Sequence, residues 1–389
     1  MINEKDNEPK QTSSKRTEHP YFVWDSIQMI PQVLGQCLDD QVQCQAENIV
    51  NKIIEKKIDK LIFLGTGSSF FATIAEKYFF DETTPFLSWS FVTSVFKNYP
   101  PEFLDAKTAV FFHSHSGKTE GDDQVVEFAK SKGAFTIGVT DIAGSALAEV
   151  VDAVFIGPGG PKKEMPASRT YATAIFRMMI LATKLGKALG KENHGKNFDQ
   201  ALNELPAMVK TFMQAYEPIA NSNVSKLQDV KSFFCIGSGP NLSTADESAL
   251  AFSQCAGVPA QSFELDNFIH GPLQTLTPGM GVVVIAAPGP LQDRLLRVAR
   301  AAEIIGAKVV LVAPEDIQVE FSMDVIINMP AGLPELLTPV IYMVPLWQTA
   351  YHFGLLGRGG HPDRLSMDKP EFIEAFSYLM KKDKWVTKK

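Results

Sequence analysis

Short, mostly apolar runs alternate along this chain with segments of helical periodicity. In the first half, buried strands are predicted at 61–64, 109–112, 135–139 and 153–156. In the second half, similar runs occur at 232–236, 282–285, 308–312 and 325–327. Segments between them, such as 125–131, have the apolar spacing of helices. The alternation predicts an α/β protein in which parallel sheets are covered by helices on both faces.

The repetition of this plan predicts two similar units. The first strand of each half runs into a glycine-rich turn, Gly65-Thr66-Gly67-Ser68-Ser69 in one and Gly237-Ser238-Gly239-Pro240 in the other. An amphipathic helical region at about 170–189 closes the first half, and the Gly-, Lys- and Asn-rich segment 190–197 is expected to be a linker. The expected division is a flexible N-terminal arm over 1–21, a first domain over 22–195, a second domain over 205–360 and a C-terminal tail over 361–389.

Composition narrows the class of protein. A chain of 389 residues exceeds the usual size of one core, so two domains are expected. The formal net charge of -7 argues against nucleic acid as a partner, because nucleic-acid-binding domains carry a basic stripe. The 4 cysteines form no CxxC pair, so neither zinc nor a disulfide framework is indicated. No apolar run approaches the length of a membrane span and the N-terminus is polar, so we expect a cytoplasmic enzyme without a membrane partner.

The candidate for binding chemistry is the segment Ser114-His115-Ser116-Gly117-Lys118-Thr119, which follows a predicted strand and precedes a predicted helix. Unpaired N–H groups at a helix N-terminus attract anions, and Ser and Thr hydroxyls donate hydrogen bonds without adding charge. The alternative is a Ser-rich turn that only caps the helix. Nucleotide sites fit poorly: both halves lack the third glycine of a dinucleotide fingerprint, and Phe112 stands where a Walker element needs glycine.

Five motifs together resemble the tandem sugar isomerase (SIS) domain family. They are Gly65 to Phe70, Ser114 to Thr119, Ala167-Ser168-Arg169-Thr170-Tyr171, Glu247-Ser248-Ala249-Leu250 and His270-Gly271-Pro272-Leu273. That family includes the isomerase half of glucosamine-6-phosphate synthase and the fructosamine-6-phosphate deglycases. The resemblance covers about residues 22–365. It implies two tandem SIS domains, each a doubly wound parallel sheet flanked by helices.

The resemblance also implies that loops of the first half hold the anionic group of the substrate. By position, Ser69, Ser114, Ser116 and Thr119 would bind a phosphate, and a sulfonate would fit the same oxyanion site. His115 stands where the synthases have glutamine; it would donate an N–H and, if protonated, positive charge, or else be a neutral loop histidine. The remaining substrate-binding set is Gly67, Ser68, Ser168 and Arg169. For Arg169, an ion pair with Glu164 or Asp152 is the alternative.

The second half carries the expected catalytic residues. In the family, the histidine matching His270 comes from the neighbouring subunit and acts in ring opening or acid catalysis, which implies a homodimer with a shared site. The family's glutamate base sits sixteen positions earlier, where this chain has Gln254, which accepts no proton at useful pH. Glu247, Glu264 or His270 alone would replace it, although Glu247 could simply hydrogen-bond backbone amides. A lid formed by Arg358, His361, Asp363 and Arg364 is a further expectation.

These inferences predict an aldose–ketose isomerase that acts on a small anionic hexose, most simply a sugar 6-phosphate. The alternatives are a deglycase or deaminase of a phosphorylated ketosamine, and a catalytically silent sugar-phosphate sensor. No cofactor is implied, because isomerisation proceeds by proton transfer. No metal is implied, because no His/Asp cluster has ligand spacing.

Overall fold

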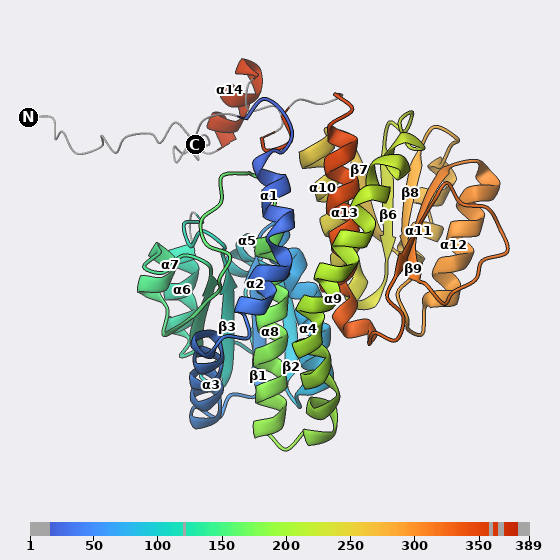
Figure 1. Ribbon diagram of the computed structural model, residues 1–389. Coiled ribbons are helices and arrows are strands. Elements are labelled where there is room, and N and C mark those ends of the chain that lie inside the picture. The colour runs from blue at the N-terminus through green and yellow to red at the C-terminus, as the bar shows by residue number, and fades with distance from the viewer. Residues whose placement is uncertain (1–15, 120–121, 358–360, 365–368, 380–389) are drawn as a thin grey trace, which may run out of the picture.

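Two five-stranded parallel sheets form the framework of the protein (Figure 1). The computed structural model describes residues 16–119, 122–357, 361–364 and 369–379. The first sheet has the order β2-β1-β3-β4-β5, with β1 (Lys60–Gly65), β2 (Leu87–Val92), β3 (Thr108–His113), β4 (Phe135–Thr140) and β5 (Ala153–Ile156). The second has the order β10-β9-β8-β6-β7, with β6 (Phe233–Gly237), β7 (Ala260–Glu264), β8 (Gly281–Ile285), β9 (Lys308–Pro314) and β10 (Val325–Met329). The predicted α/β class with two doubly wound sheets is confirmed.

The eight strands predicted from apolar runs are all present, and two further strands, β2 and β7, were missed. Both missed strands lie at a sheet edge. β2 has the sequence LSWSFV, with Leu87 63% exposed, and β7 has the sequence AQSFE, which is only partly buried. Polar side chains interrupt the apolar residues in both strands, whereas the edge strands β5 and β10 keep the short apolar runs AVF and VII, so the pattern gave no signal for β2 and β7.

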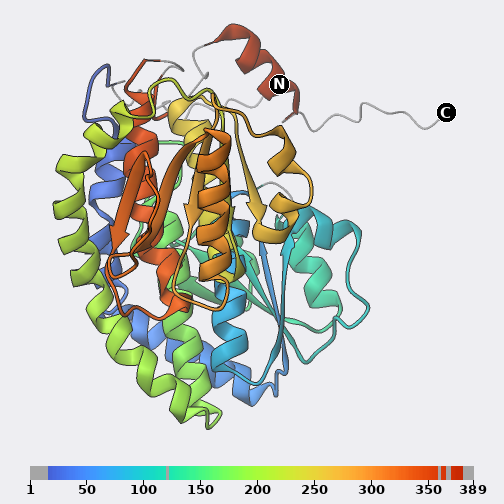
Figure 2. The same ribbon diagram turned by 90° about the vertical axis from the view of Figure 1, so that its right-hand side faces the viewer.

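Helices cover both sheets and fill the space between them. The first half contains α1 (Phe22–Gln28), α2 (Ile30–Gln36), α3 (Asp40–Glu55), α4 (Ser68–Thr83), α5 (Thr93–Asn98), α6 (Asp122–Ser131), α7 (Ala146–Val150) and α8 (Arg169–Ala188). The rest of the chain contains α9 (Glu192–Ser225), α10 (Leu242–Ala251), α11 (Leu265–Ile269), α12 (Gln292–Ile305), α13 (Thr338–Gly354) and α14 (Pro370–Leu379). Figure 2 shows α12, in orange, in front of the second sheet.

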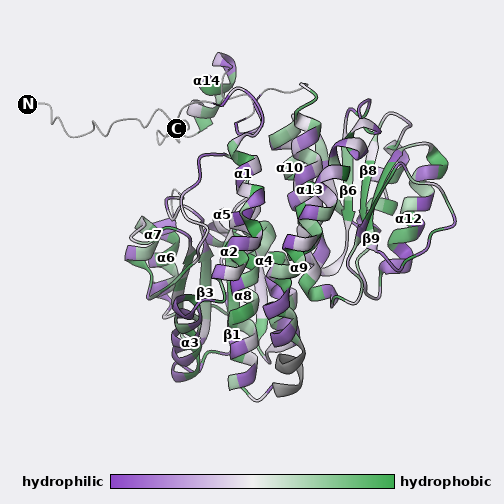
Figure 3. Ribbon diagram, in the orientation of Figure 1, coloured by the Kyte–Doolittle hydropathy of each residue, from purple (hydrophilic) through white to green (hydrophobic). Residues whose placement is uncertain are grey.

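The two halves share one hydrophobic core. Helices α4, α8, α9, α10 and α13 pack against one another between the sheets (Figure 1). The core includes the large buried side chains Phe176 of α8 and Trp347 of α13, and Figure 3 shows how hydrophobic the strands and these helices are. The region expected to be amphipathic, α8, is buried on nearly every face, because both halves contact it. Residues 190–197, expected to be a linker, largely belong to α9, a helix of 34 residues that packs on α8 and α13.

Both ends of the described chain meet near α1. Residues 16–21, expected to belong to the flexible arm, are anchored by Arg16, whose Nη2 lies 2.7 Å from Asp25 Oδ2, and by His19, whose Nδ1 lies 2.7 Å from the Tyr351 hydroxyl. In the tail, Asp363 Oδ1 accepts a hydrogen bond from Val23 N at 2.7 Å. Residues 1–15 and Arg358 of the expected lid lie outside the described residues.

Candidate functional site

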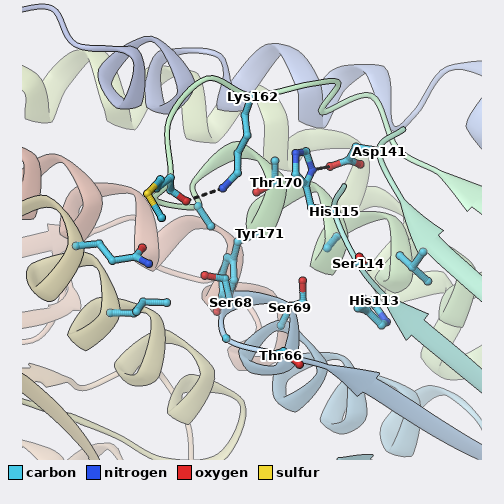
Figure 4. A pocket seen from close by; sticks show the side chains of 18 of the residues that line it. Thr66, Ser68, Ser69, His113, Ser114, His115, Asp141, Lys162, Thr170 and Tyr171 are labelled. Atoms are coloured by element: carbon cyan, nitrogen blue, oxygen red, sulfur yellow. Dashed lines mark hydrogen bonds and ion pairs between the residues drawn. The ribbon is translucent and has the colours of Figure 1, made fainter. Parts of the chain in front are cut away.

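A cavity of about 310 Å³ opens where β1 and β3 end. Strand β2 follows β1 on one side in the sheet order, whereas β3 and the later strands lie on its other side, so the strand order reverses between β1 and β3. Ligands of doubly wound sheets usually bind at such a point. Most of the cavity wall comes from the first half (Figure 4). Leu250 and Gln254 close it from the second half. The site therefore lies between the two halves of the chain.

The first wall is the N-terminus of α4. Gly67 adopts φ 57° and ψ -133°, which only glycine tolerates readily, and the turn brings Thr66, Gly67, Ser68 and Ser69 to the cavity. The first intrahelical bond runs from Phe71 N to Gly67 O, so the amides of the first turn remain available. A helix of 16 residues thus directs the positive end of its dipole at the cavity, which favours an anion there.

The second wall is a buried chain of charged groups that fixes His115. Nδ1 of His115 lies 2.8 Å from Asp141 Oδ2, and Asp141 Oδ1 lies 2.7 Å from Arg177 Nη1. Burial alone would raise the pKa of Asp141, but Arg177 and His115 outweigh it and lower that pKa below the ordinary value. Because Nδ1 is held by Asp141, the Nε2 atom of His115 is the one left for a ligand. Ser114 lies beside it and also lines the cavity (Figure 4).

The other two hydroxyls of the predicted anion site lie outside the cavity lining. Ser116 is exposed, and its Oγ accepts a hydrogen bond from Lys118 N at 3.3 Å. Thr119 is exposed, and its Oγ1 lies 2.7 Å from Ser114 Oγ. Burial raises the pKa of the neighbouring Asp122 to about 6, although hydrogen bonds from the Thr119 and Ser114 hydroxyls oppose the change. The structure therefore groups Ser69, Ser114 and His115 but not Ser116 or Thr119.

Ser168 and Arg169, expected to bind substrate, also lie outside the cavity lining. The Arg169 guanidinium lies 2.7 Å from Glu164 Oε1 and donates to the carbonyl oxygens of Gly159 and Pro161, both at 2.9 Å. Ser168 is fully buried, and its hydroxyl donates to Ser26 at 2.6 Å. The bonds of Arg169 hold the loop 157–168 in place, and Ser168 ties the end of that loop to α1. The alternative ion pair between Arg169 and Glu164 is the one that the structure contains.

That loop brings a lysine that sequence reasoning missed. Lys162 lines the cavity, and its Nζ donates to Met165 O at 2.7 Å and Pro166 O at 3.4 Å. Burial lowers the pKa of Lys162, although Glu164 and Glu247 oppose the change. The loop can approach Asp141 because residue 157 is glycine: a Cβ there would lie 2.2 Å from Asp141 Oδ1. A lysine in a Pro- and Gly-rich loop directly after a strand is the only sequence signal for this position.

The expected catalytic residues are dispersed. Gln254 lines the cavity. Glu247 is buried outside the lining, with Oε1 3.4 Å from Trp347 Nε1. Burial raises the pKa of Glu247 to about 8, against the effect of hydrogen bonds from Ser68 and Trp347.

Glu264 caps α11, accepting from Asp266 N at 2.7 Å, and also accepts from Ser238 Oγ at 3.0 Å. His270 is exposed at the end of α11, away from the cavity of its own chain.

Other lining residues also escaped sequence reasoning. Asp141 and Arg177 form the charged chain described above, and His113 lies beneath the site with its Nε2 3.1 Å from Glu76 Oε2. The Tyr171 hydroxyl bonds to Ser243 Oγ of α10. Within the described residues, no group of three or more His, Cys, Asp and Glu side chains is arranged to hold a metal ion. In the same part of the chain, no helix is long and apolar enough to cross a bilayer.

Two similar α/β units, with a polar cavity at the strand ends of the first, place the protein in the doubly wound α/β class. The SIS domain model matches residues 52–184, so this part of the chain is a SIS domain. The chain is 28% identical over 356 residues to the glutamine–fructose-6-phosphate aminotransferase (isomerizing) of Thermococcus kodakarensis, covering 90% of this chain and 58% of that protein. The corresponding protein of Pyrococcus horikoshii is 30% identical over 308 residues, covering 79% of this chain and 50% of that protein.

The fold has a close counterpart among solved structures. The C-terminal domain of glucosamine-fructose-6-phosphate aminotransferase from Francisella tularensis superimposes with a TM-score of 0.80 at 16% identity, covering 87% of this chain and 97% of that one. At this identity the likeness establishes the fold alone. The chain spans a little over half of the length of the first curated relative and half of the second.

Proposed function

We propose that this chain is an aldose–ketose isomerase that acts on an anionic hexose, most simply a sugar 6-phosphate. The observation that carries the proposal is the cavity end where the N-terminus of α4, Ser69, Ser114 and His115 meet. Helix N-termini and hydroxyl donors suit a tetrahedral oxyanion, and an imidazole backed by Asp141 adds a fixed donor. The names of the curated relatives, which include fructose 6-phosphate, support a phosphorylated hexose.

The other end of the cavity would hold the reacting carbons. Gln254 and Leu250 close it from the second half, and Gln254 would hold a sugar hydroxyl or a water rather than move a proton. His270 lies exposed away from its own cavity, which supports its action in the site of a second copy of the chain. The proposal therefore includes a homodimer in which each site takes His270 from its neighbour.

The test is a panel of fructose 6-phosphate, tagatose 6-phosphate and glucosamine 6-phosphate, followed by NMR for aldose–ketose interconversion and by a coupled assay for ammonia. We expect interconversion of a ketose phosphate without ammonia release. Ammonia release from glucosamine 6-phosphate would instead make the protein a deaminase. A sugar-dependent rise in melting temperature without any turnover would make it a sensor. Replacing the phosphate with a sulfonate in the preferred sugar tests which oxyanion fits.

A further inference from the structure

An isomerase of this kind needs a group that takes a proton from the carbon beside the carbonyl, and this inference rests on the proposed function. The carboxylates suggested by the sequence do not lie at the cavity. Glu264 is engaged by the backbone of α11 and by Ser238. Glu247 lies behind Ser68 and is absent from the lining. Gln254, which does line the cavity, has no basic atom at useful pH.

Most titratable side chains that line the cavity already have partners. His115 and Arg177 both bind Asp141. His113 Nε2 lies 3.1 Å from Oε2 of the buried Glu76, although neither ring nitrogen makes a hydrogen bond. The Tyr171 hydroxyl bonds to Ser243, and burial raises its pKa well above the ordinary value, so it releases no proton near neutral pH. These lining groups are thus held by neighbouring side chains, and none of them is a free base beside the reacting carbons in the proposed function.

Lys162 differs from all of them. Among the described residues, its Nζ forms no ion pair and donates hydrogen bonds to the carbonyl oxygens of Met165 and Pro166. Figure 4 shows its side chain reaching into the pocket from the loop, toward Tyr171 and Ser68 and away from Asp141. The amine thus faces the part of the cavity that is not occupied by the His115–Asp141 pair.

The loop that carries Lys162 is held on two sides. Arg169 binds Gly159 O, Pro161 O and Glu164 from below, and Met165 N donates to Asp363 O of the C-terminal tail at 2.8 Å. Backbone and side-chain anchors of this kind fix a functional group to the accuracy that proton transfer requires. The tail residue Asp363, expected in a lid, therefore supports the loop rather than the substrate.

We propose that Lys162 is the catalytic proton acceptor at the uncharged end of the cavity. The neutral amine takes the proton from the carbon next to the sugar carbonyl: the C–H bond breaks, an N–H bond forms, and the electron pair moves to give an enediolate with its charge on the former carbonyl oxygen. The resulting ammonium returns a proton to the neighbouring carbon while the hydroxyl proton moves between the two sugar oxygens. Protons and electrons balance, and no oxidant, reductant or second substrate is needed.

The electrostatic surroundings favour the neutral form of the amine. Burial is the largest influence and lowers the pKa of Lys162, and Arg169 lowers it further. Glu164 from the same loop, Glu247 from α10 and Asp141 after β4 act in the opposite direction without cancelling the effect of burial. Activity on a ketose phosphate should therefore rise with pH as Lys162 loses its proton.

The decisive variant is Lys162→Arg, because arginine can donate to Met165 O and Pro166 O but accepts no proton. We expect kcat to fall by about 100-fold or more, with KM within about threefold, since general base catalysis contributes about 10²–10⁴-fold. Lys163→Arg is the matched control, because Lys163 is exposed and lies over the Phe22 ring, outside the cavity. A Lys162→Arg enzyme that keeps a third or more of the wild-type kcat would overturn the inference.

Two further readouts separate catalysis from a structural role. In Lys162→Ala, added ethylamine should restore turnover in proportion to its neutral form, and no restoration would count against a proton-accepting amine. NMR titration of ¹³C-dimethylated lysines, with Lys162→Arg used for assignment, should show the Lys162 signal titrating below those of exposed lysines. If the wild-type protein turns over no sugar phosphate, the proposed function fails. A Lys162 signal that titrates with the exposed lysines contradicts the inference independently of turnover.

Discussion

The two halves of the chain have the same sheet topology but differ at the corresponding strand ends. In the first half, β1 and β3 end in an open cavity lined by Ser69 and His115. In the second half, β6 and β8 end beside the carboxylate of Glu335: a Cβ added to Gly289 would lie 2.4 Å from Glu335 Oε2. A second carboxylate, Glu264, accepts from Ser238 in the glycine-rich turn. The carboxylate of Glu264 at this turn disfavours an anion.

The difference shows that duplication of the fold did not duplicate the site. In the proposed function the first half supplies the anion end of the cavity, whereas α10 and the π-helical turn Phe252–Ala256 of the second half line its opposite wall through Leu250 and Gln254. On this proposal the two similar units have different tasks, and most of the predictions compare a residue of the first half with a residue of the same type in the second half.

The largest expected effect comes from Arg177→Met in the first half. The change leaves Asp141 buried without its cation, which should destabilise the protein by about 3–5 kcal/mol. The matched change in the second half, Arg294→Met, removes an exposed pair with Asp266 and should cost less than about 1 kcal/mol. Denaturant unfolding of both variants measures the difference, and equal effects would contradict the comparison.

The Asp141 pair also predicts a pH dependence. Because the folded-state pKa of Asp141 is depressed, its contribution to stability is present above the ordinary Asp pKa of about 3.9 and is lost as pH falls through the folded pKa. Unfolding measured between pH 7 and pH 3 should show this loss in the wild-type protein and a smaller one in Arg177→Met. If the free energy of unfolding changed with pH equally in both proteins, the Asp141–Arg177 pair would not be the cause of the loss.

The next effect concerns close packing at the cavity. Gly157→Ala places a Cβ 1.6 Å from Arg177 Nη1, so the loop or the charged chain must move, at a cost of about 1–3 kcal/mol and with loss of turnover. Gly279→Ala in the second half meets no atom within 4 Å and should be nearly neutral. Thermal unfolding and kcat of the two variants compare them, and a neutral Gly157→Ala would show that the loop is not held as described.

A smaller effect should separate the two glycine-rich turns in binding. Ser69→Ala should weaken binding of inorganic phosphate about 10-fold, because a hydrogen bond to a charged group contributes about 1.5–3 kcal/mol. Ser238→Ala in the second half should leave that affinity unchanged, since Ser238 donates to Glu264. Isothermal titration calorimetry gives both values. Equal weakening by the two changes would mean that both turns bind the anion.

The smallest effect is expected from Glu335→Gln. Burial raises the pKa of Glu335, so the folded protein keeps a proton that the unfolded chain releases, and stability falls as pH rises above the ordinary Glu pKa of about 4.3. The glutamine variant should lack this loss and melt slightly higher at pH 7. The exposed Glu320→Gln serves as the control. A lower melting temperature for Glu335→Gln would show that the carboxylate stabilises the second turn.

The sequence was sufficient for the framework because central strands such as β3 and β8 are buried on both faces and so appear as apolar runs. It missed the strands β2 and β7, in which polar side chains interrupt the apolar residues. It could not assign the role of α9, because a helix of 34 residues that packs on α8 and α13 depends on tertiary contacts rather than on local composition.

The site divides in the same way. Motifs local to a strand end, such as Gly67 to Ser69 and Ser114-His115, indicated residues that the structure places at the cavity. Arg169 was expected there too, but its side chain binds the carbonyl oxygens of Gly159 and Pro161. The sequence does not show that the loop 157–168 lies close enough to form these bonds. Asp141, Lys162 and Arg177 come from three separate segments, and only the tertiary structure brings them together.

The most direct test of this account is a crystal structure of the protein with fructose 6-phosphate, in which the position of the phosphorus atom is determined. We predict that the phosphate binds at the N-terminus of α4, within hydrogen-bond distance of Ser69 and Ser114, and that the sugar carbonyl faces Lys162 and Gln254. A phosphate bound by Lys162 with the carbonyl toward His115, or a phosphate at the turn that contains Ser238, would contradict it.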